Sequence, residues 1–258
     1  MIKNINFHID DLDLMKKYPK EIFYKGNLEL LKKRKVSIVG SRKPNQYTQQ
    51  FTHILAKELS SNNITIVSGA AMGVDAIAHN GAGTNNTIAV AGTGLDIRYP
   101  AINNNLIISI ENNGLILSQF KNNQMATKYT FPLRNELVVA LGEVLIVTQA
   151  DLKSGTMRSV EYALKMEIPI YVLPHRLNES EGTNKLLQEN KAKAIYDVDK
   201  FIEDFIGCKN EIKSKDSFIE YSKTNPTYDE AMKLYPAEVF QYELLGKIEV
   251  KDGLIIVI

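Results

Sequence analysis

The feature that most constrains the fold is a regular alternation of two hydrophobic patterns. Short runs rich in branched apolar residues recur along the chain, at residues 36–39, 64–67, 87–90, 115–117, 144–147 and 170–173, with a weaker one at 194–196. Between them lie stretches with apolar residues at helical spacing, such as Phe51, Leu55 and Leu59. Nearly continuous apolar strands that alternate with helices are typical of a parallel sheet covered on both faces. Because crossovers between parallel strands are right-handed, the pattern predicts an α/β fold with a Rossmann-like, doubly wound, mostly parallel sheet.

The pattern changes at both ends of this region. Residues 1–33 lack it, and we expect them to form an N-terminal arm or short helical preface to a Rossmann-like domain at 34–207. Residues 208–258 start with a polar, linker-like stretch. Three short helical segments follow, and then two strand-sized runs around Asp252-Gly253, a dipeptide suited to a tight hairpin turn. Three helices and a hairpin predict a small C-terminal winged-helix module.

The third of these helical segments would be the one to enter a DNA groove. It carries Glu238 and Glu243, with Lys247 just past its end. Since carboxylates facing phosphates are unfavourable, a protein-contact or dimer-supporting role is favoured over DNA binding for this module.

Composition limits where a polyanion could bind. The 258 residues have a formal net charge of +1, so nucleic-acid binding requires a local basic patch rather than a global field. The single cysteine, Cys208, has no partner for an internal disulfide, and no zinc-type spacing of ligands occurs. A reducing, cytoplasmic setting is expected, and neither a signal peptide nor a membrane span is predicted.

The loops that follow the predicted strands carry the candidate site, because ligands of such sheets bind beyond the carboxyl ends of the strands. The first loop contains Gly40, Ser41, Arg42 and Lys43. Its glycine allows close approach of the backbone, its amides can donate to phosphate oxygens, and the arginine adds a bidentate fork. The second loop begins with Gly69 and is built of small residues.

A third segment combines cations with aromatic rings. Lys128, Phe131 and Arg134 lie within seven residues, as a single-stranded nucleic acid requires for its phosphates and bases. The alternative is that the phenylalanine is a core residue and the cations are merely solvated. Further cations on the same predicted edge form a candidate basic rim that acidic residues dilute: Arg98, Lys121, Lys153 and Arg158.

Two kinds of enzyme have related sheets. The first loop lacks G-x-G-x-x-G, and no acid ends the second strand, which disfavours a dinucleotide enzyme. Nucleoside-monophosphate phosphoribohydrolases carry a glutamate shortly after a phosphate-binding Gly-Thr pair. Here Arg158 stands at that position after Ser154-Gly155-Thr156, and Glu161 lies about one helical turn away. A phosphoribohydrolase-like enzyme is the alternative function.

These motifs together resemble the DNA-processing protein A (DprA, or Smf) family of bacterial natural transformation. The resemblance covers residues 35–196 and rests on six motifs in order: Gly40-Ser41-Arg42; Ser68-Gly69 with Ala71, Gly73, Val74, Asp75, Ala78 and His79; residues 87–90; Gly92, Gly94, Leu95, Asp96, Tyr99 and Pro100; Phe131-Pro132 with Arg134-Asn135; and Ser154-Gly155-Thr156, followed by Gly182, Asn184, Leu186 and Leu187.

The resemblance implies a non-catalytic protein without a cofactor that binds incoming single-stranded DNA, dimerises through its Rossmann domain and helps load the recombinase RecA. It places DNA at Gly40, Ser41, Arg42, Lys128, Phe131, Arg134 and Asn135. Family members often end in a winged helix. The chain departs from the family at Glu136, where a second arginine is usual, at Gln149, and at Pro174-His175. The first departure removes one cation from the expected DNA track.

Overall fold

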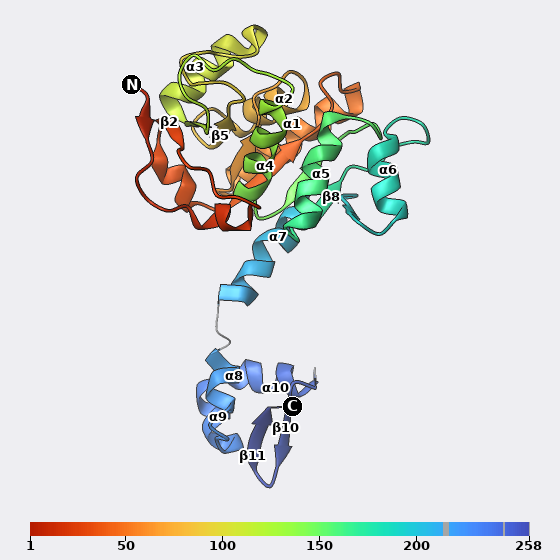
Figure 1. Cartoon of the computed structure of the whole chain (residues 1–258). Helices are drawn as coiled ribbons and strands as arrows, with labels where there is room; N and C mark the ends of the chain where they lie inside the picture. The colour runs from red at the N-terminus through yellow and green to blue at the C-terminus, as the bar shows by residue number, and fades with distance from the viewer. Residues whose placement is uncertain (214–216, 245, 258) are drawn as a thin grey trace. The chain divides into compact units, whose positions relative to one another are not determined.

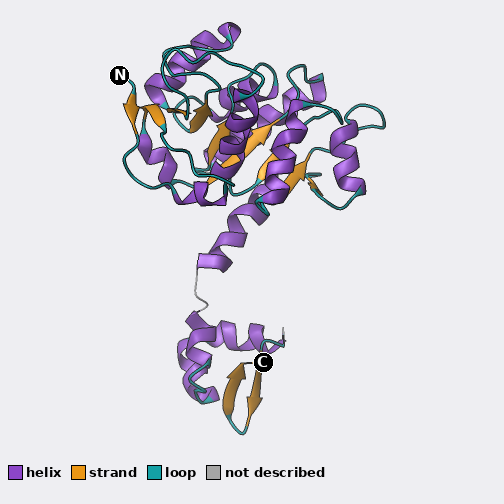
Figure 2. Cartoon of the chain, in the orientation of Figure 1, coloured by secondary structure: helices purple, strands orange, loops and turns teal. Residues whose placement is uncertain are grey.

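The computed structural model describes residues 1–213, 217–244 and 246–257. Within it the chain forms two compact units, Met1–Asp199 and Lys200–Ile258. Figures 1 and 2 show the first as a sheet with helices on its faces and the second as short helices with a two-stranded hairpin. None of the described helices has both the length and the apolar character needed to cross a membrane.

A nine-stranded sheet forms the first unit, in the order β1-β2-β6-β5-β4-β3-β7-β8-β9. The strands are β1 (Lys3–Asn4), β2 (Phe23–Gly26), β3 (Lys35–Val39), β4 (Thr65–Ser68), β5 (Thr87–Val90), β6 (Leu115–Ser118), β7 (Leu145–Val147), β8 (Ile170–Val172) and β9 (Lys193–Ala194). All pairs from β6 to β9 are parallel. The predicted doubly wound, mostly parallel sheet is thus confirmed.

Helices connect these strands and cover both faces of the sheet. They are α1 (Gln46–Ser61), α2 (Val74–Ala82), α3 (Asn104–Asn113), α4 (Thr130–Leu141), α5 (Gly155–Lys165) and α6 (Glu181–Gln188), with 3₁₀ turns η1 (Asp10–Leu14), η2 (Leu28–Lys32) and η3 (Ala101–Asn103). α1 packs against α2, and α4 packs against α5. This pairing follows from right-handed crossovers that run outward in both directions from the middle of the sheet.

The strand order reverses direction between β3 and β7. From β3 the chain proceeds to β4, β5 and β6 on one side, and α4 then returns it to β7 on the other side. The loops that leave β3 and β7 therefore diverge, which opens a crevice at their carboxyl ends. A ligand is expected to bind at this point.

Residues 1–33 differ from our expectation of a separate arm or helical preface. β2 pairs antiparallel with β6, β1 pairs with β2, and the two strands extend the sheet. Leu12 and Leu30, each in a 3₁₀ turn, are buried in the main core, and Asp11 pairs with the buried Lys35 at 3.1 Å. Single apolar residues in short turns show no strand or helix period, so the sequence pattern did not reveal this integration.

The second unit has its own core. Its elements are α7 (Val198–Lys213), which begins just before the boundary, α8 (Ser217–Ser222), α9 (Tyr228–Leu234), α10 (Pro236–Leu244), β10 (Ile248–Lys251) and β11 (Leu254–Val257). Phe218, Val239 and Ile255 are buried together, and Thr227 caps α9 in a capping box with Glu230.

The predicted order of three short helices and an antiparallel hairpin is confirmed for this unit, while its assignment as a winged helix stays a prediction. The unit boundary lies at 199/200 rather than at the predicted 207/208. α7 continues to Lys213 through most of the stretch expected to be a linker.

Candidate functional site

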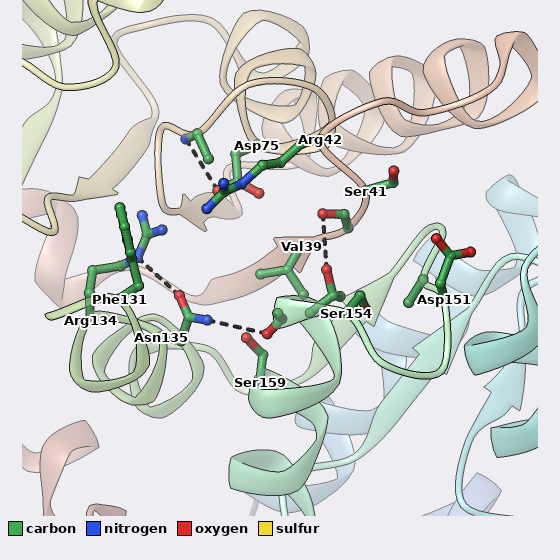
Figure 3. A pocket seen from close by; sticks show the side chains of 15 residues that line it. Val39, Ser41, Arg42, Asp75, Phe131, Arg134, Asn135, Asp151, Ser154 and Ser159 are labelled. Carbon is green, nitrogen blue, oxygen red and sulfur yellow. Dashed lines mark hydrogen bonds between the residues drawn. The ribbon is translucent and has the colours of Figure 1, made fainter. Parts of the chain in front are cut away.

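A cavity of about 390 Å³ lies at the point where the strand order reverses (Figure 3). Its walls come from the loop after β3, the loop after β4 with the first turn of α2, the loop between β7 and α5, and the first turns of α4 and α5. We call it the switch-point cavity. Seven of the residues predicted to bind DNA lie at this cavity or beside it: Gly40, Ser41, Arg42, Phe131, Arg134 and Asn135 line it, and Gly69 lines an adjoining hollow.

The loop after β3 is held in a single arrangement by its neighbours. A Cβ on Gly40 would lie 2.7 Å from a methyl carbon of Val74, so only glycine lets the loop approach α2 this closely. The Thr156 hydroxyl donates to the Gly40 carbonyl at 3.0 Å and joins the two loops across the cavity. The Ser41 oxygen accepts from the Lys43 amide at 3.1 Å, so its hydroxyl proton can still be directed to a ligand.

Arg134 is a buried cation rather than an exposed DNA contact, although its side chain borders the cavity. It is only 5% exposed, and its Nη1 donates to the carbonyls of Val90, at 3.0 Å, and Gly69. Its Nε donates to the Asn135 side chain at 3.0 Å. A Cβ on Gly69 would collide with the guanidinium. Gly69 is therefore a glycine because Arg134 needs the space, not because a ligand does.

Asp75 supplies the negative charge that accompanies this arginine. Its carboxylate is buried and accepts from the amides of Gly69, at 3.2 Å, and Ala71, at 3.3 Å. Burial raises the pKa of Asp75, while the charge of Arg134 and these two amide donors act in the opposite direction. This aspartate belongs to the Ser68-Gly69 motif of the family resemblance.

Phe131 and Arg42 face one another at the mouth of the cavity. The Arg42 guanidinium carbon lies 5.5 Å from the centre of the Phe131 ring, and that of Arg134 lies 5.9 Å from it. Figure 3 shows Arg42 reaching from the loop after β3 toward the ring, which projects from the first turn of α4. Phe131 is half-buried and Arg42 is exposed. The pair offers a flat apolar face and a cation side by side.

The remaining predicted cations do not line the cavity. Lys121 pairs with Glu21 at 3.4 Å, and Arg158 pairs with Glu161 at 2.8 Å. Lys128 is exposed, with its Nζ 5.1 Å from the centre of the Tyr129 ring. Lys43 and Lys153 are exposed on the loops at the cavity's edge. Arg98 pairs with Glu111 at 2.8 Å. The predicted basic rim is therefore reduced by internal ion pairing at three of its positions.

Glu136 has a partner away from the cavity. Its carboxylate accepts from the backbone amide of Lys16, just after η1, at 3.3 Å. α4 packs against η1 on this side. The family departure at this position therefore lies on the side of α4 that faces the N-terminal segment.

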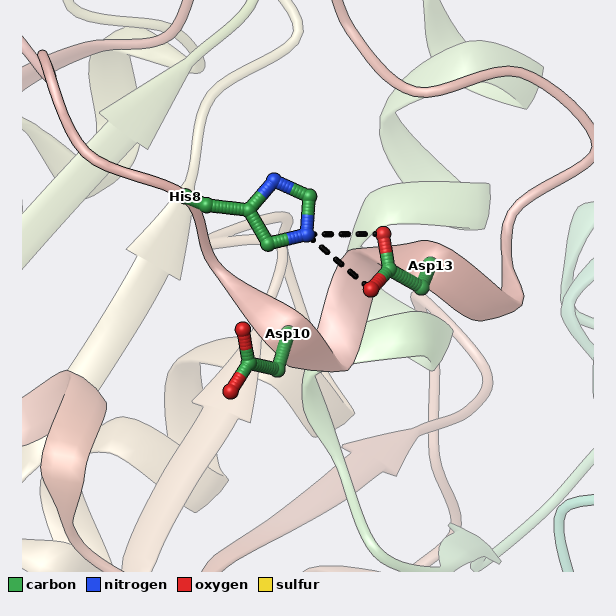
Figure 4. Close-up of side chains that lie close together, drawn as sticks. All are labelled: His8, Asp10 and Asp13. Carbon is green, nitrogen blue, oxygen red and sulfur yellow. Dashed lines mark hydrogen bonds and ion pairs between the residues drawn. The ribbon is translucent and has the colours of Figure 1, made fainter.

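A second cluster of side chains lies apart from the cavity. His8, Asp10 and Asp13 offer ligand atoms within 4.8 Å of one another, and the His8 Nε2 lies 2.9 Å from a carboxylate oxygen of Asp13 (Figure 4). The hydrogen bond to Asp13 raises the pKa of His8. All three side chains are exposed. We assign no metal to them, because exposed groups of this kind are common without one.

Known proteins similar to this chain share one description. The family model of DNA recombination-mediator protein A matches residues 7–206. A solved structure of DNA processing protein A from Helicobacter pylori, described for its single-stranded DNA binding mode, is 42% identical and superposes with a TM-score of 0.78, covering 80% of this chain and 96% of that one. DNA processing protein A of Streptococcus pneumoniae superposes with a TM-score of 0.72 at 34% identity, covering 77% and 72%.

Curated sequences agree with these structures. The DNA processing protein DprA of S. pneumoniae strain R6 is 37% identical over 183 residues, which cover 69% of this chain and 64% of the relative. The chain spans about half to two thirds of the length of the curated relatives it matches. With a family model that covers most of the first unit and motifs that lie at the cavity between β3 and β7, the chain belongs to the DNA recombination-mediator protein A family.

Proposed function

We propose that this chain binds single-stranded DNA at the switch-point cavity and acts, without catalysing a reaction, as a mediator of DNA recombination. The observation that carries the proposal is the pairing of Arg42 with Phe131 at the mouth of a cavity on the carboxyl edge of the sheet. The relative from H. pylori, described for its single-stranded DNA binding mode, supports the choice of ligand.

The charges of the cavity orient the strand. Asp75 and Asp151 line it together with Arg42. A phosphate is therefore favoured on the Arg42 side, where the guanidinium and the Ser41 hydroxyl can both donate to it. Sugar and base groups are favoured on the side of Asp151 and Asn135, because the carboxylate can only accept hydrogen bonds and the amide is uncharged. No element of the cavity is shaped to enter a duplex groove, so the bases must already be unpaired.

Further steps follow from the same proposal. We infer that the bound strand is passed to the RecA recombinase, that two copies pair through the α/β unit, and that the protein works in the cytoplasm on DNA taken up in natural transformation. The second unit, if it is a winged helix, would contact protein rather than DNA, since Glu238 and Glu243 lie on α10.

A phosphoribohydrolase-like activity is less well supported by the geometry. No carboxylate stands where the required acid would follow Thr156, and the guanidinium of the nearby Arg158 is paired with Glu161 at 2.8 Å. Neither of the two side chains lines the cavity. The carboxylates that do line it are Asp75, which is already bonded to two backbone amides, and Asp151.

We expect the protein to bind an oligothymidine strand at least about tenfold more tightly than a blunt duplex of equal length, a difference of about 1.4 kcal/mol. Bases that stack on a protein ring must leave the duplex stack, and phosphates alone do not discriminate between the two forms. Fluorescence anisotropy with labelled strands, with unlabelled duplex as competitor, measures the ratio. Equal affinity for the two DNA forms would contradict the proposal.

The cations and the ring should act through different terms of the binding energy. Each phosphate contact releases counterions and contributes about 0.7 to the slope of log affinity against log salt for a single strand. We expect Arg42→Ala and Lys128→Ala each to weaken binding and to flatten this slope. Phe131→Ala should weaken binding by about 1–3 kcal/mol with an unchanged slope, because stacking releases no counterions.

Salt titrations of the three variants, each with a thermal melt, make this comparison. Lys165→Ala is a matched control, since Lys165 ends α5 and does not line the cavity. Unchanged slopes in both cation variants would remove the phosphate contacts from the proposal. A Phe131→Ala protein that melts far below the wild type would show that the ring acts in folding.

A further inference from the structure

A second hollow adjoins the switch-point cavity on the far side of the wall that Phe131, Arg42 and Arg134 form between them. Residues that line it but not the cavity include Met72, Tyr99 and Pro100. We call it the Tyr99 hollow. We propose that one unstacked base of a bound strand lies across its mouth, with the Tyr99 ring as the stacking surface and Met72 and Phe131 at its sides. This inference rests on the proposed function and names a contact that the function alone does not require.

Tyr99 is presented as a binding surface rather than as a core residue. Its side chain is 47% exposed and Met72 is 40% exposed, although both are large and apolar in most of their surface. The ring centres of Tyr99 and Phe131 lie 6.0 Å apart with their planes tilted by 43°. Gly92 lies against the same ring, since a Cβ there would lie 3.2 Å from Phe131 and would push the ring by a few tenths of an ångström. Two aromatic rings therefore converge on one opening.

The loop that carries Tyr99 is anchored on both sides. Arg98, its neighbour, makes a bidentate pair with Glu111 at 2.8 and 3.1 Å. Lys25 bridges Glu111, at 3.1 Å, and the Leu95 carbonyl, at 2.8 Å. Glu111 and Lys25 are largely buried. Ordering of a binding loop costs affinity, and a loop held in advance by ion pairs avoids that cost.

A second tie joins the two loops that border the hollow. The Asn103 side-chain amide donates to the carbonyls of Ala70 and Ala71, both at 3.0 Å. Asn103 ends η3, which begins directly after Pro100. The position of Met72 is thus linked to that of Tyr99, and the two sides of the hollow are held at a set separation.

The chemistry of the rim identifies the occupant. A flat apolar surface lies next to the exposed Arg42 cation, so the matching ligand has a planar ring and an anionic group one short linkage apart, as a nucleotide does. The enclosed space is only about 20 Å³, far too small to hold a nucleobase. A base therefore lies across the mouth of the hollow against Tyr99 and does not enter it, which gives stacking without reading of the base edge.

The test compares a thymidine strand with a strand of the same length that carries abasic residues throughout. Stacking of a base on an aromatic side chain corresponds to about 5- to 150-fold in affinity. We expect Tyr99→Ala to weaken binding of the thymidine strand within this range and to leave binding of the abasic strand unchanged. Tyr99→Phe keeps the ring and should bind both strands as the wild type does. Arg42→Ala should weaken binding of both strands, because both carry phosphates.

Each outcome decides one claim. If Tyr99→Ala binds the thymidine strand as tightly as the wild type, or loses equal affinity for both strands while its melting temperature is unchanged, the inference is wrong and the proposed function stands. A Tyr99→Ala variant that melts like the wild type and shows the base-dependent loss supports it. A wild-type chain that binds neither strand overturns the proposed function and this inference together.

Discussion

Replacing Arg134 by alanine is expected to destabilise the α/β unit by about 3–5 kcal/mol, a larger effect than any we expect on DNA binding. The guanidinium is 5% exposed and satisfies the carbonyls of Gly69 and Val90, which would lose their donor. The carboxylate of Asp75 would in addition be left buried without the charge that accompanies it. Removal of one member of a buried charge pair is costly, because the other member stays desolvated.

Urea titration of the wild type and of Arg134→Ala measures this loss. Arg42→Ala is the matched control: it removes a guanidinium that faces the same Phe131 ring from the exposed side, and it should change stability by less than about 1 kcal/mol. If Arg134→Ala unfolds at the same urea concentration as the wild type but no longer binds DNA, Arg134 contacts DNA directly and does not act through stability.

Acidification from pH 7 to pH 4 is expected to remove about 3 kcal/mol of stability through His79 alone. This histidine lies in α2, fully buried, with its Nδ1 2.6 Å from the Thr87 hydroxyl, which itself donates to the Ile66 carbonyl at 2.8 Å. Since that hydroxyl proton is already used, Nδ1 must donate and Nε2 carries no proton. Burial first, and then the charge of Arg134, lower the pKa of His79 from 6.5 to about 3.

The direction of the pH effect follows from these two values. Between pH 6.5 and pH 3 the unfolded chain binds a proton at His79 that the folded chain does not bind. Stability from this group is therefore complete above pH 6.5 and is lost progressively as the pH falls toward 3.

A matched variant isolates this group from the carboxylates that also titrate. His79→Asn places an amide nitrogen close to the position of Nδ1 and has no acid titration of its own. Urea titrations at pH 7 and pH 4 should show that the wild type loses about 3 kcal/mol more than His79→Asn on acidification. Equal losses in the two proteins would mean that His79 is protonated in the folded chain, and would contradict its burial as a neutral ring.

The family can be recognised from sequence motifs, whereas the change of stability with pH depends on which side chains the tertiary structure buries. His79 belongs to a motif that indicated the family, yet nothing in the sequence shows whether its ring meets solvent. The position of a residue along a helix shows whether its side chain is buried only when the elements packed around that helix are known. The neighbours of His79 are Thr87 on β5 and the charge of Arg134 on α4, both brought near by the parallel sheet.

The sheet, its central strands and the location of the site were determined by the sequence alone. Each strand from β3 to β8 coincides with an apolar, branched run, because a strand buried on both faces must be apolar at every position. The ligand loops could then be identified, since parallel strands end at a common edge. Gly40, Ser41, Arg42 and Phe131 were found in this way, Asn135 came from the family resemblance, and the structure brings all five to one cavity.

Only the tertiary structure decided which cations remain available to a ligand. Arg42 and Arg134 look alike in sequence, but the first lies on an exposed loop and the second is buried against two strand carbonyls. Lys121 and Arg158 are similarly paired with Glu21 and Glu161. Residues 1–33 joined the sheet through an open strand edge on β6 that no local pattern reveals. The reason is common to all of these cases: burial and ion pairing are set by contacts between distant segments, whereas hydrophobic periodicity reports only what one segment needs from its surroundings.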